Sequence, residues 1–500
     1  MKYLRFFVVA LFLVPSISSA ATPSAGGFEV TGWIPYWRTA TGTADVLPHL
    51  SDLTEVNPFV YTLRSDGTFL DNGNLSQEPW LSFLATAKAQ KVRVIPTIMT
   101  SNSELLHELL SDSAKRIALE DTIVKLVNDN NFDGIDIDFE GKSAADKDNF
   151  SLFLKGLYQR MGKKWVMCTI ESRTPIESRY FGTTVPPDAE IYANDFVEIN
   201  KYCDRVRIMA YDQQGIDLRL ASQAASSSQL YAPVADPAWV EKVVNVAAQS
   251  ISRNKILIGV PTYGYEYDVT AYANNEYTYN ILWTFNPGYA TPIAAQYGIT
   301  PQRNAAGEMY FSYVPSATST TPVALGPNSA FLAAAAASQY ATQYNSHLNF
   351  RLMDWPDAQS VKTKIDLAKR LGVRGISIFK LDGGQDPAIW SVLSGVAGKP
   401  VSAGATGSVS LGALTRGLDL GSTGADVRTL QKILNSDTAT RVAASGAGSP
   451  GNESTYFGPA TARAVQKFQV KYGIAKAGNS GYGYVGPSTR MKLNSLLASI

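Results

Sequence analysis

The run Phe-Asp-Gly-Ile-Asp-Ile-Asp-Phe-Glu at 132–140 places acidic residues at alternating positions of an otherwise apolar strand. Alternation puts Asp136, Asp138 and Glu140 on one face of that strand. The apolar residues between them predict a strand that is buried on both faces, rather than a solvated edge strand or a site for a hard cation. Carboxylates that are held together in a buried place shift one another's pKa, so this run indicates a catalytic site.

Eight short, β-rich apolar runs separated by helical patterns organise most of the chain. We expect strands at 28–34, 56–62, 92–98, 133–139, 165–171, 205–211, 256–262 and 374–380, with helices such as 104–128 and 144–161 between them. This alternation predicts an α/β fold, a closed (β/α)8 TIM barrel, whose sites lie at the carboxyl ends of the strands. Glu140, Tyr211 and Asp212 fall at such ends.

The pattern changes at 263–355, where Tyr-, Thr- and Pro-rich segments replace the helical repeats. Residues 276–284 and 309–314 alternate as antiparallel strands do. We therefore expect a small α+β insertion between the seventh and eighth barrel strands. An amphipathic helix at 357–371 then leads back into the barrel.

The N-terminus has the three parts of a secretory signal: basic residues, an apolar stretch from Phe6 to Val14, and a small-residue segment ending near Ala21. We expect residues 1–21 to be removed and the catalytic part to occupy residues 22–397. The apolar stretch is too short for a stable membrane span, and no other stretch of about 18 apolar residues follows. The protein is therefore predicted to be exported rather than embedded in the membrane.

A second unit follows the catalytic part. The stretch 398–412 is rich in Gly, Ala and Ser, which predicts a flexible linker. In the remaining residues, 413–500, Val427, Leu430 and Leu434 share one face of a helix. We expect this unit to be a small all-α domain.

The acidic run resembles the Asp-x-x-Asp-x-Asp-x-Glu signature of glycoside hydrolase family 18, with Asp133, Asp136, Asp138 and Glu140 at its four positions. Other segments agree with this family in the order that the barrel requires. They are Gly-Trp-Ile-Pro-Tyr-Trp at 32–37, Met-Ala-Tyr-Asp at 209–212, Ile-Gly-Val-Pro-Thr-Tyr-Gly at 258–264, and Gly-Ile-Ser-Ile-Phe-Lys-Leu at 375–381. The resemblance covers roughly residues 28–397.

This resemblance implies catalysis in which the substrate's own 2-acetamido oxygen attacks the anomeric carbon. Glu140 would be the general acid and then the general base, while Asp138 would orient the acetamido N–H. Asp136 would share a proton or a hydrogen bond with Asp138, and Tyr211 would donate its hydroxyl to the acetamido carbonyl. Asp133 would support the structure rather than the chemistry.

Sugar rings expose apolar C–H faces that stack on aromatic side chains. The residues expected to contact the substrate are Tyr36, Trp37, Met209, Asp212, Tyr263, Tyr265 and Phe379. Two features depart from the family. Phe379 stands where the eighth strand usually offers a tryptophan, and the third-strand segment at 96–100 lacks the Ser-x-Gly-Gly common among chitinases. Both departures leave the substrate preference open, but not the type of reaction.

The C-terminal unit resembles a peptidoglycan-binding domain of type 1. The likeness rests on Leu-Asp-Leu-Gly-Ser-Thr-Gly-Ala-Asp-Val at 418–427 and Ala-Val-Gln-Lys-Phe-Gln at 464–469. The segments 456–461 and 484–489 each put a proline at a first helical position. A Ser-, Gly- and Ala-rich insertion at 437–454 is expected to be a loop.

Together these features predict a secreted or wall-associated retaining glycosidase that cleaves β-1,4 bonds of N-acetylglucosamine-containing peptidoglycan. One alternative is a chitinase, since the same chemistry serves any 2-acetamido sugar. Another is a carbohydrate-binding protein without catalysis, which the presence of Glu140 disfavours. Residues 401–500 carry ten lysines and arginines against four aspartates and glutamates, which favours attraction to an anionic polymer.

We expect a polysaccharide substrate, no nucleic-acid partner, no cofactor and a monomer. His49, His107 and His347 are scattered along the chain and form no ligand pair at metal spacing, so no metal site is predicted. The two cysteines are Cys168, inside a predicted strand, and Cys203, just before the next one. Whether they pair depends on a register that the sequence leaves open.

Overall fold

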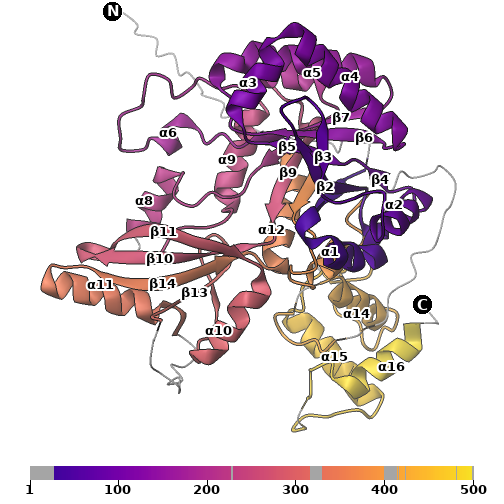
Figure 1. Ribbon diagram of the computed structural model, residues 1–500. Coiled ribbons are helices and arrows are strands. Elements are labelled where there is room, and N and C mark those ends of the chain that lie inside the picture. Colours follow the sequence, from indigo (N-terminus) through magenta and orange to yellow (C-terminus); the bar gives the residue numbers. More distant parts are fainter. Residues whose placement is uncertain are drawn as a thin grey trace, which may run out of the picture. The chain divides into compact units, whose positions relative to one another are not determined.

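The computed structural model describes residues 27–226, 229–315, 329–398 and, with four single-residue gaps, 414–497. The chain divides into two compact units on either side of residue 401 (Figure 1). The predicted signal peptide and almost all of the predicted linker lie outside the described residues. Among the described helices, none combines the length and the apolar character that crossing a bilayer requires.

The first unit is built around a closed parallel barrel, as predicted. Each strand pairs with the next, and β1 closes the ring by pairing with both β2 and β15. The barrel strands are β1 (Glu29–Pro35), β2 (Glu55–Leu63), β5 (Thr97–Thr100), β6 (Gly134–Phe139), β7 (Trp165–Glu171), β8 (Arg205–Met209), β9 (Ile256–Pro261) and β15 (Gly375–Phe379). All eight predicted strands are confirmed within a few residues.

The predicted strand at 92–98 is interrupted. Its first part is β4 (Arg93–Val94), and the pairing resumes at β5. Pro96 lies in the gap and has no N–H to give to a neighbouring strand, which accounts for the break. A further short strand, β3 (Phe69–Asp71), pairs antiparallel with β2.

Helices surround the barrel (Figure 1). They are α1 (Thr39–Val46), α2 (Trp80–Ala89), α3 (Ser103–Ser111), α4 (Ser113–Asp129), α5 (Lys147–Met161), α6 (Ile176–Arg179), α7 (Phe196–Tyr202), α8 (Leu218–Ser226), α9 (Pro237–Ala247), α12 (Ala358–Leu371) and α13 (Ile389–Leu393). The single helix predicted at 104–128 is wrong. Asp112 divides it, because its carboxylate accepts hydrogen bonds from the N–H groups of Ala114 (2.8 Å) and Lys115 (3.0 Å) and so begins a new helix.

Between β9 and β15 the chain forms a separate five-stranded antiparallel sheet, in the order β11-β10-β14-β13-β12. Its elements are β10 (Gly264–Tyr272), β11 (Glu276–Phe285), α10 (Ala290–Gln296), β12 (Gln302–Arg303), β13 (Met309–Tyr313), α11 (Leu332–Tyr344) and β14 (Leu348–Trp355). The strands predicted at 276–284 and 309–314 are therefore confirmed. Phe285, Phe311 and Trp355 belong to a hydrophobic core of this sheet's own.

A disulfide joins Cys168 of β7 to Cys203, two residues before β8. Their Cα atoms lie 5.9 Å apart, within the range that a disulfide spans. Adjacent parallel strands bring the two cysteines together: Cys168 lies opposite Val206 in the register of β7 and β8. This register answers the question that the sequence left open.

The second unit consists of three helices, α14 (Ala425–Asn435), α15 (Pro459–Lys471) and α16 (Pro487–Leu497). The predicted apolar face of α14 is confirmed, because Val427, Leu430 and Leu434 belong to the buried core of the second unit. Phe468 of α15 belongs to the same core. Both predicted prolines stand at the first helical position. The described residues of 437–454 form neither helix nor strand, as expected of a loop.

Candidate active site

The acidic run ends at the carboxyl end of β6, inside the barrel. Asp136 is fully buried, Asp138 is 4% exposed, and Glu140 is partly exposed just beyond the strand. Gly141 follows with φ of +62°, a left-handed conformation that glycine adopts without strain and that turns the chain away from the strand. The alternation predicted from sequence therefore places three carboxylates at one end of the barrel.

Asp136 is held by four side chains. Its Oδ1 accepts from the hydroxyl of Thr169 (2.9 Å), and its Oδ2 accepts from the hydroxyl of Thr97 (2.8 Å) and the indole of Trp33 (3.2 Å). Arg207 lies 2.7 Å from the same Oδ2. No hydrogen bond joins Asp136 to Asp138 among the described residues, and the expected sharing of a proton or hydrogen bond between them stays a prediction.

Arg207 was not identified from the sequence. It is fully buried and also pairs with Glu55 of β2, whose Oε1 accepts from Asn57 as well (2.8 Å). A charge inside a protein is tolerated when it is paired and hydrogen-bonded. A signal was present, because Arg207 shares the parity of Met209 and Tyr211 and must face the barrel interior as they do.

Asp138 has a different environment. Its Oδ1 is buried and has no hydrogen-bond partner among the described residues. Burial raises its pKa well above the usual range, and the neighbouring carboxylates of Glu140 and Asp136 raise it further. Asp138 is thus a carboxyl that favours its protonated form and has an oxygen available to a ligand.

Glu140 also has a raised pKa. Burial is the largest cause, followed by the negative charge of Glu171, while Lys142 acts in the opposite direction. Glu171 ends β7, and its Oε1 accepts from the N–H of Gly141 (3.1 Å). Lys142 is almost fully buried, donates to the carbonyl of Phe139, and lies 3.7 Å from Glu171. The sequence analysis missed this charge pair, although Glu171 stands at the carboxyl end of a predicted strand.

Tyr211 and Asp212 follow β8. Tyr211 is 8% exposed, and burial together with the nearby Asp138 raises the pKa of its hydroxyl well above the usual range, so the hydroxyl remains a donor. Asp212 has φ of +58° and accepts hydrogen bonds from the hydroxyls of Tyr263 and Tyr265 (2.6 Å to Tyr265). These bonds hold its carboxylate beside Tyr211.

Aromatic rings surround Phe379, at the end of β15. The ring of Tyr211 stacks on it at 5.7 Å, and those of Trp33, Phe59 and Tyr263 meet it edge-on at 5.8–6.0 Å. Met209 is partly buried and packs on the barrel core.

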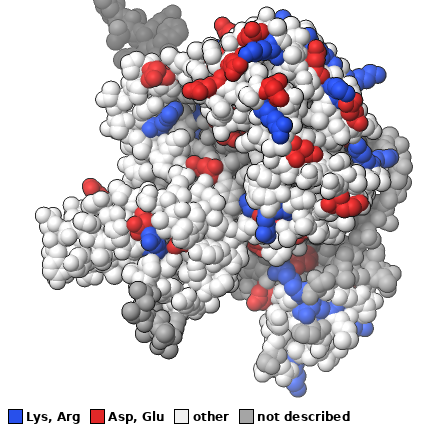
Figure 2. All heavy atoms as spheres, viewed as in Figure 1, with Lys and Arg blue, Asp and Glu red and all other residues white. Residues whose placement is uncertain are grey.

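The row of rings continues outward. Trp37 meets Phe59 at 5.9 Å and Tyr36 at 5.0 Å. Trp37 is 49% exposed and Tyr36 is 39% exposed, so the row passes from the buried acids to the surface. Phe59 was not predicted as part of it. Figure 2 shows that few charged side chains cover the insertion sheet in this view, in contrast to the helices above it.

No group of three or more His, Cys, Asp or Glu side chains among the described residues is arranged to hold a metal ion. Asp138, Glu140 and Tyr211 can supply two carboxyl groups and one hydroxyl beside an aromatic wall. This set suits general acid and base catalysis on a sugar.

Comparison with known proteins agrees with this geometry. Residues 30–384 match the family described as glycosyl hydrolases family 18, and residues 423–493 match the putative peptidoglycan binding domain. The chain is 22% identical over 353 residues to the uncharacterized glycosylase YvbX of Bacillus subtilis, covering 69% of this chain and 86% of that protein. It is 25% identical over 337 residues to the cortical fragment-lytic enzyme of the same organism, covering 65% and 64%.

Solved structures share the fold. The spore cortex-lytic enzyme SleL of Bacillus megaterium QM B1551 has a TM-score of 0.54 and 19% identity, covering 75% of each chain. A class V chitinase from Pseudomonas fluorescens Pf-5 has a TM-score of 0.54 and 20% identity, covering 73% of this chain and 98% of that one. At such identities the likeness establishes the fold alone.

Proposed function

The chain belongs to glycosyl hydrolases family 18 and is a glycosidase, and on that premise we propose that it cleaves β-1,4 bonds of the N-acetylglucosamine-containing glycan of peptidoglycan. The observation that carries the proposal is the pairing of two units in one chain. One unit has a family 18 site with Asp138, Glu140 and Tyr211, and the other matches a peptidoglycan binding domain. The similarity to the cortical fragment-lytic enzyme of Bacillus subtilis supports the same substrate class.

In the proposed mechanism Glu140 protonates the leaving oxygen while the substrate's 2-acetamido oxygen attacks the anomeric carbon. Asp138 accepts a hydrogen bond from the acetamido N–H with its unpartnered oxygen, and Tyr211 donates to the acetamido carbonyl. Glu140, now ionised, then takes a proton from a water molecule as that water attacks the anomeric carbon. This attack opens the cyclic intermediate and gives a product with retained configuration. Asp136, fixed by its four partners, keeps a negative charge near Asp138 and stabilises the positive intermediate.

The substrate lies along the aromatic row in this proposal. Phe379 forms the floor beside the acids, and Trp37 and Tyr36 stack on sugar rings farther out. Tyr263 and Tyr265 hold Asp212, whose carboxylate binds a sugar hydroxyl, and Met209 packs at the barrel mouth.

The proposal assigns a task to each part of the chain. Residues 1–21 direct export, residues 22–397 perform catalysis, with 263–355 as one wall of the cleft, and residues 398–412 link them to 413–500. The last unit keeps a monomeric enzyme at the cell wall or envelope.

Digestion of purified peptidoglycan and of chitin, with mass spectrometry of the new reducing ends, tests the substrate. We expect N-acetylglucosamine reducing ends from peptidoglycan at a higher rate than chitin fragments. Cleavage of chitin alone would replace the proposed substrate. NMR spectra taken early in the reaction should show β-anomers first, and initial α-anomers would exclude the substrate-assisted mechanism.

A further inference from the structure

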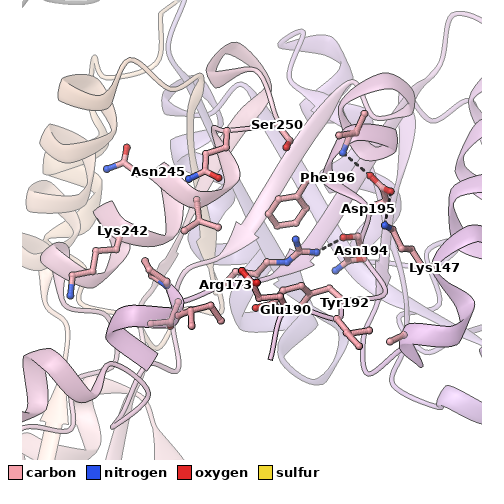
Figure 3. Close-up of a pocket in the computed structure, with 18 of the residues that line it drawn as sticks. Lys147, Arg173, Glu190, Tyr192, Asn194, Asp195, Phe196, Lys242, Asn245 and Ser250 are labelled. Carbon is pink, nitrogen blue, oxygen red and sulfur yellow. Dashed lines mark hydrogen bonds and ion pairs between the residues drawn. The ribbon is translucent and has the colours of Figure 1, made fainter. Parts of the chain in front are cut away.

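A cavity opens next to the loop that follows β7. It measures about 860 Å³ and lies between the loop after β7, the segment before α7, and α9 (Figure 3). We call it the side pocket. Among its lining residues are Arg173, Tyr192, Asn194, Phe196 and Lys242. None of these residues has a part in the proposed mechanism.

Arg173 is the lining cation of the side pocket that forms no ion pair among the described residues, although the charges of Glu171 and Asp195 favour its charged form. Its guanidinium lies 3.6 Å from the ring centre of Phe196 and 3.9 Å from that of Tyr192, and it donates to the carbonyl of Asn194 (Figure 3). No carboxylate of the described residues lies within ion-pair distance of it. Burial lowers its pKa to about 10, which leaves it charged at neutral pH.

The other two cations that line the side pocket are neutralised. Lys147 lies 3.1 Å from Asp195, and Lys242 lies 2.7 Å from Asp217. Two aromatic faces hold the guanidinium of Arg173 in one orientation, which suits a planar, bidentate anion such as a carboxylate.

Asn194 adds a second requirement. It is 8% exposed, and its side-chain N–H donates to Glu171 (2.6 Å), but its Oδ1 is buried without a partner among the described residues. A buried acceptor without a hydrogen-bond partner favours the binding of a ligand that has an N–H or O–H donor. Arg173 and Asn194 together therefore suit a carboxylate with an N–H group nearby, which is the chemistry of a peptide and not of phosphate or sulfate dianions.

The side pocket is also close to the catalytic acid. Glu171 accepts from Asn194 with one oxygen and from the N–H of Gly141, the residue after Glu140, with the other. Two side chains thus separate the wall of the side pocket from the catalytic turn. An extended peptide of four residues spans about 13 Å.

We propose that the side pocket binds an acidic peptide carried by the glycan, through Arg173 on a carboxylate and Asn194 Oδ1 on a peptide N–H. This inference rests on the proposed function, because peptidoglycan carries such peptides and chitin does not. Substrates with their peptides attached would then bind more tightly than bare glycan of the same length.

Calorimetric titration of the full chain with a synthetic N-acetyl-alanyl-γ-glutamyl-lysyl-alanine tetrapeptide, whose net charge is −1 at neutral pH, tests the binding directly. We expect saturable binding that weakens at least 10-fold when both carboxylates of the peptide are amidated. Arg173→Gln should weaken binding by a similar factor, and Arg173→Lys by less. Arg179→Gln, on neighbouring α6 and outside the side pocket, should bind as the wild type does.

Absence of binding, or equal binding of the amidated peptide, would each overturn the proposal. The arm with the amidated peptide uses the wild type, so it decides even if Arg173→Gln fails to fold. Cleavage supplies an independent readout. The wild type should show a kcat/KM several-fold higher on glycan with peptides than on glycan stripped by an amidase, and Arg173→Gln should remove most of that difference.

The two proposals can fail separately. If the wild type cleaves neither form of the glycan, the proposed substrate is wrong. If it cleaves both forms at the same kcat/KM, the substrate stands and the peptide site is overturned.

Discussion

The barrel and the C-terminal unit both bury polar side chains, but of different kinds. Arg207, Asp136 and Glu55 are completely buried charges in the barrel. The C-terminal unit instead buries neutral amides, Gln431 and Gln469, each of which ties loop backbone groups to a helix. Burying a charge costs far more than burying an amide, and it is repaid only by complete pairing.

The contrast between buried charges and buried amides separates the two units by the kind of side chain on which each depends. The barrel holds ionisable groups together at its site, and buried charges such as Arg207 and Asp136 are stable there because they are paired. The C-terminal unit fixes its loops with neutral groups. Gln469 donates to the carbonyls of Gly481 and Tyr484 and accepts from the N–H of Gly483, which holds the loop without any titrating group.

The largest expected effect is the loss of Arg207. Arg207→Leu leaves Asp136 as a buried charge without a cation and leaves Glu55 with Arg93 alone, which should lower the free energy of unfolding of the barrel by about 3–5 kcal/mol. All eight tryptophans lie between Trp33 and Trp390, so tryptophan fluorescence during urea denaturation follows the first unit, barrel and insertion, and not the C-terminal unit. Exposed Arg64→Leu should change the midpoint little, and an equally small change in both variants would contradict the role of the buried pairs.

Glu140→Gln should remove proton donation while preserving the shape of the cleft. Turnover of a soluble N-acetylglucosamine oligosaccharide should fall by at least ~100-fold, with ligand affinity largely retained. Steady-state kinetics and calorimetry with the same oligosaccharide separate the two effects. Glu104→Gln, at an exposed helical position, is the matched control, and near-normal hydrolysis by the Glu140 variant would remove Glu140 from the mechanism.

Gln469→Leu tests whether a buried amide stabilises the loop of the C-terminal unit. The loop carbonyls of Gly481 and Tyr484 lose their donor, and each unsatisfied group costs about 1–3 kcal/mol. Hydrogen exchange should therefore quicken in peptides covering 459–497 and stay unchanged in the barrel. Lys467→Gln, on the same helix but exposed, should leave the exchange rates as in the wild type. If exchange in 459–497 is as slow in the Gln469 variant as in the Lys467 variant, the Gln469 amide does not hold the loop.

Removing the C-terminal unit should affect only insoluble substrate. A chain ending at Gly398 should keep its rate on soluble oligosaccharides but lose about 10-fold in activity and in sedimentation on intact peptidoglycan, since tethering raises the local concentration of the barrel. Pelleting assays and product release from the same suspension measure this. If the shortened enzyme sediments as well as the full chain does, the unit is not the anchor.

The smallest expected effect is a shift in pH dependence. Catalysis needs protonated Glu140, so activity falls as pH rises through its pKa. The negative charge of Glu171 raises the pKa of Glu140, and the positive charge of Lys142 lowers it. Asp138 and Asp212 also lie near Glu140, and neither changes in these variants. Glu171→Gln should therefore move the basic limb of kcat/KM to lower pH.

Lys142→Met should move the same limb to higher pH, because it removes the charge that favours ionised Glu140. The two variants therefore control for each other. Limbs that move in the same direction in both variants would show that the charge pair acts on the fold and not on Glu140.

Local patterns in the sequence were enough to predict all eight barrel strands, the insertion, and the placement of Asp136, Asp138 and Glu140 on one face. Period-two alternation and turn residues act over a few positions, and burial reinforces them. The prediction failed at Asp112, where a side chain that caps the next helix interrupts an otherwise continuous helical pattern. The prediction also treated β4 and β5, which Pro96 separates, as one strand.

The sequence by itself determined the type of fold and the acids of the site, because both depend on residues that are close together in the chain. Only the tertiary structure decided which groups meet those acids. Arg207 reaches Asp136 from a strand 71 positions later, Glu171 reaches Gly141 from the next barrel strand, and the Cys168–Cys203 disulfide depends on the register of β7 and β8. These contacts depend on how neighbouring strands pair and in which register, and that pairing joins segments tens of residues apart in the chain.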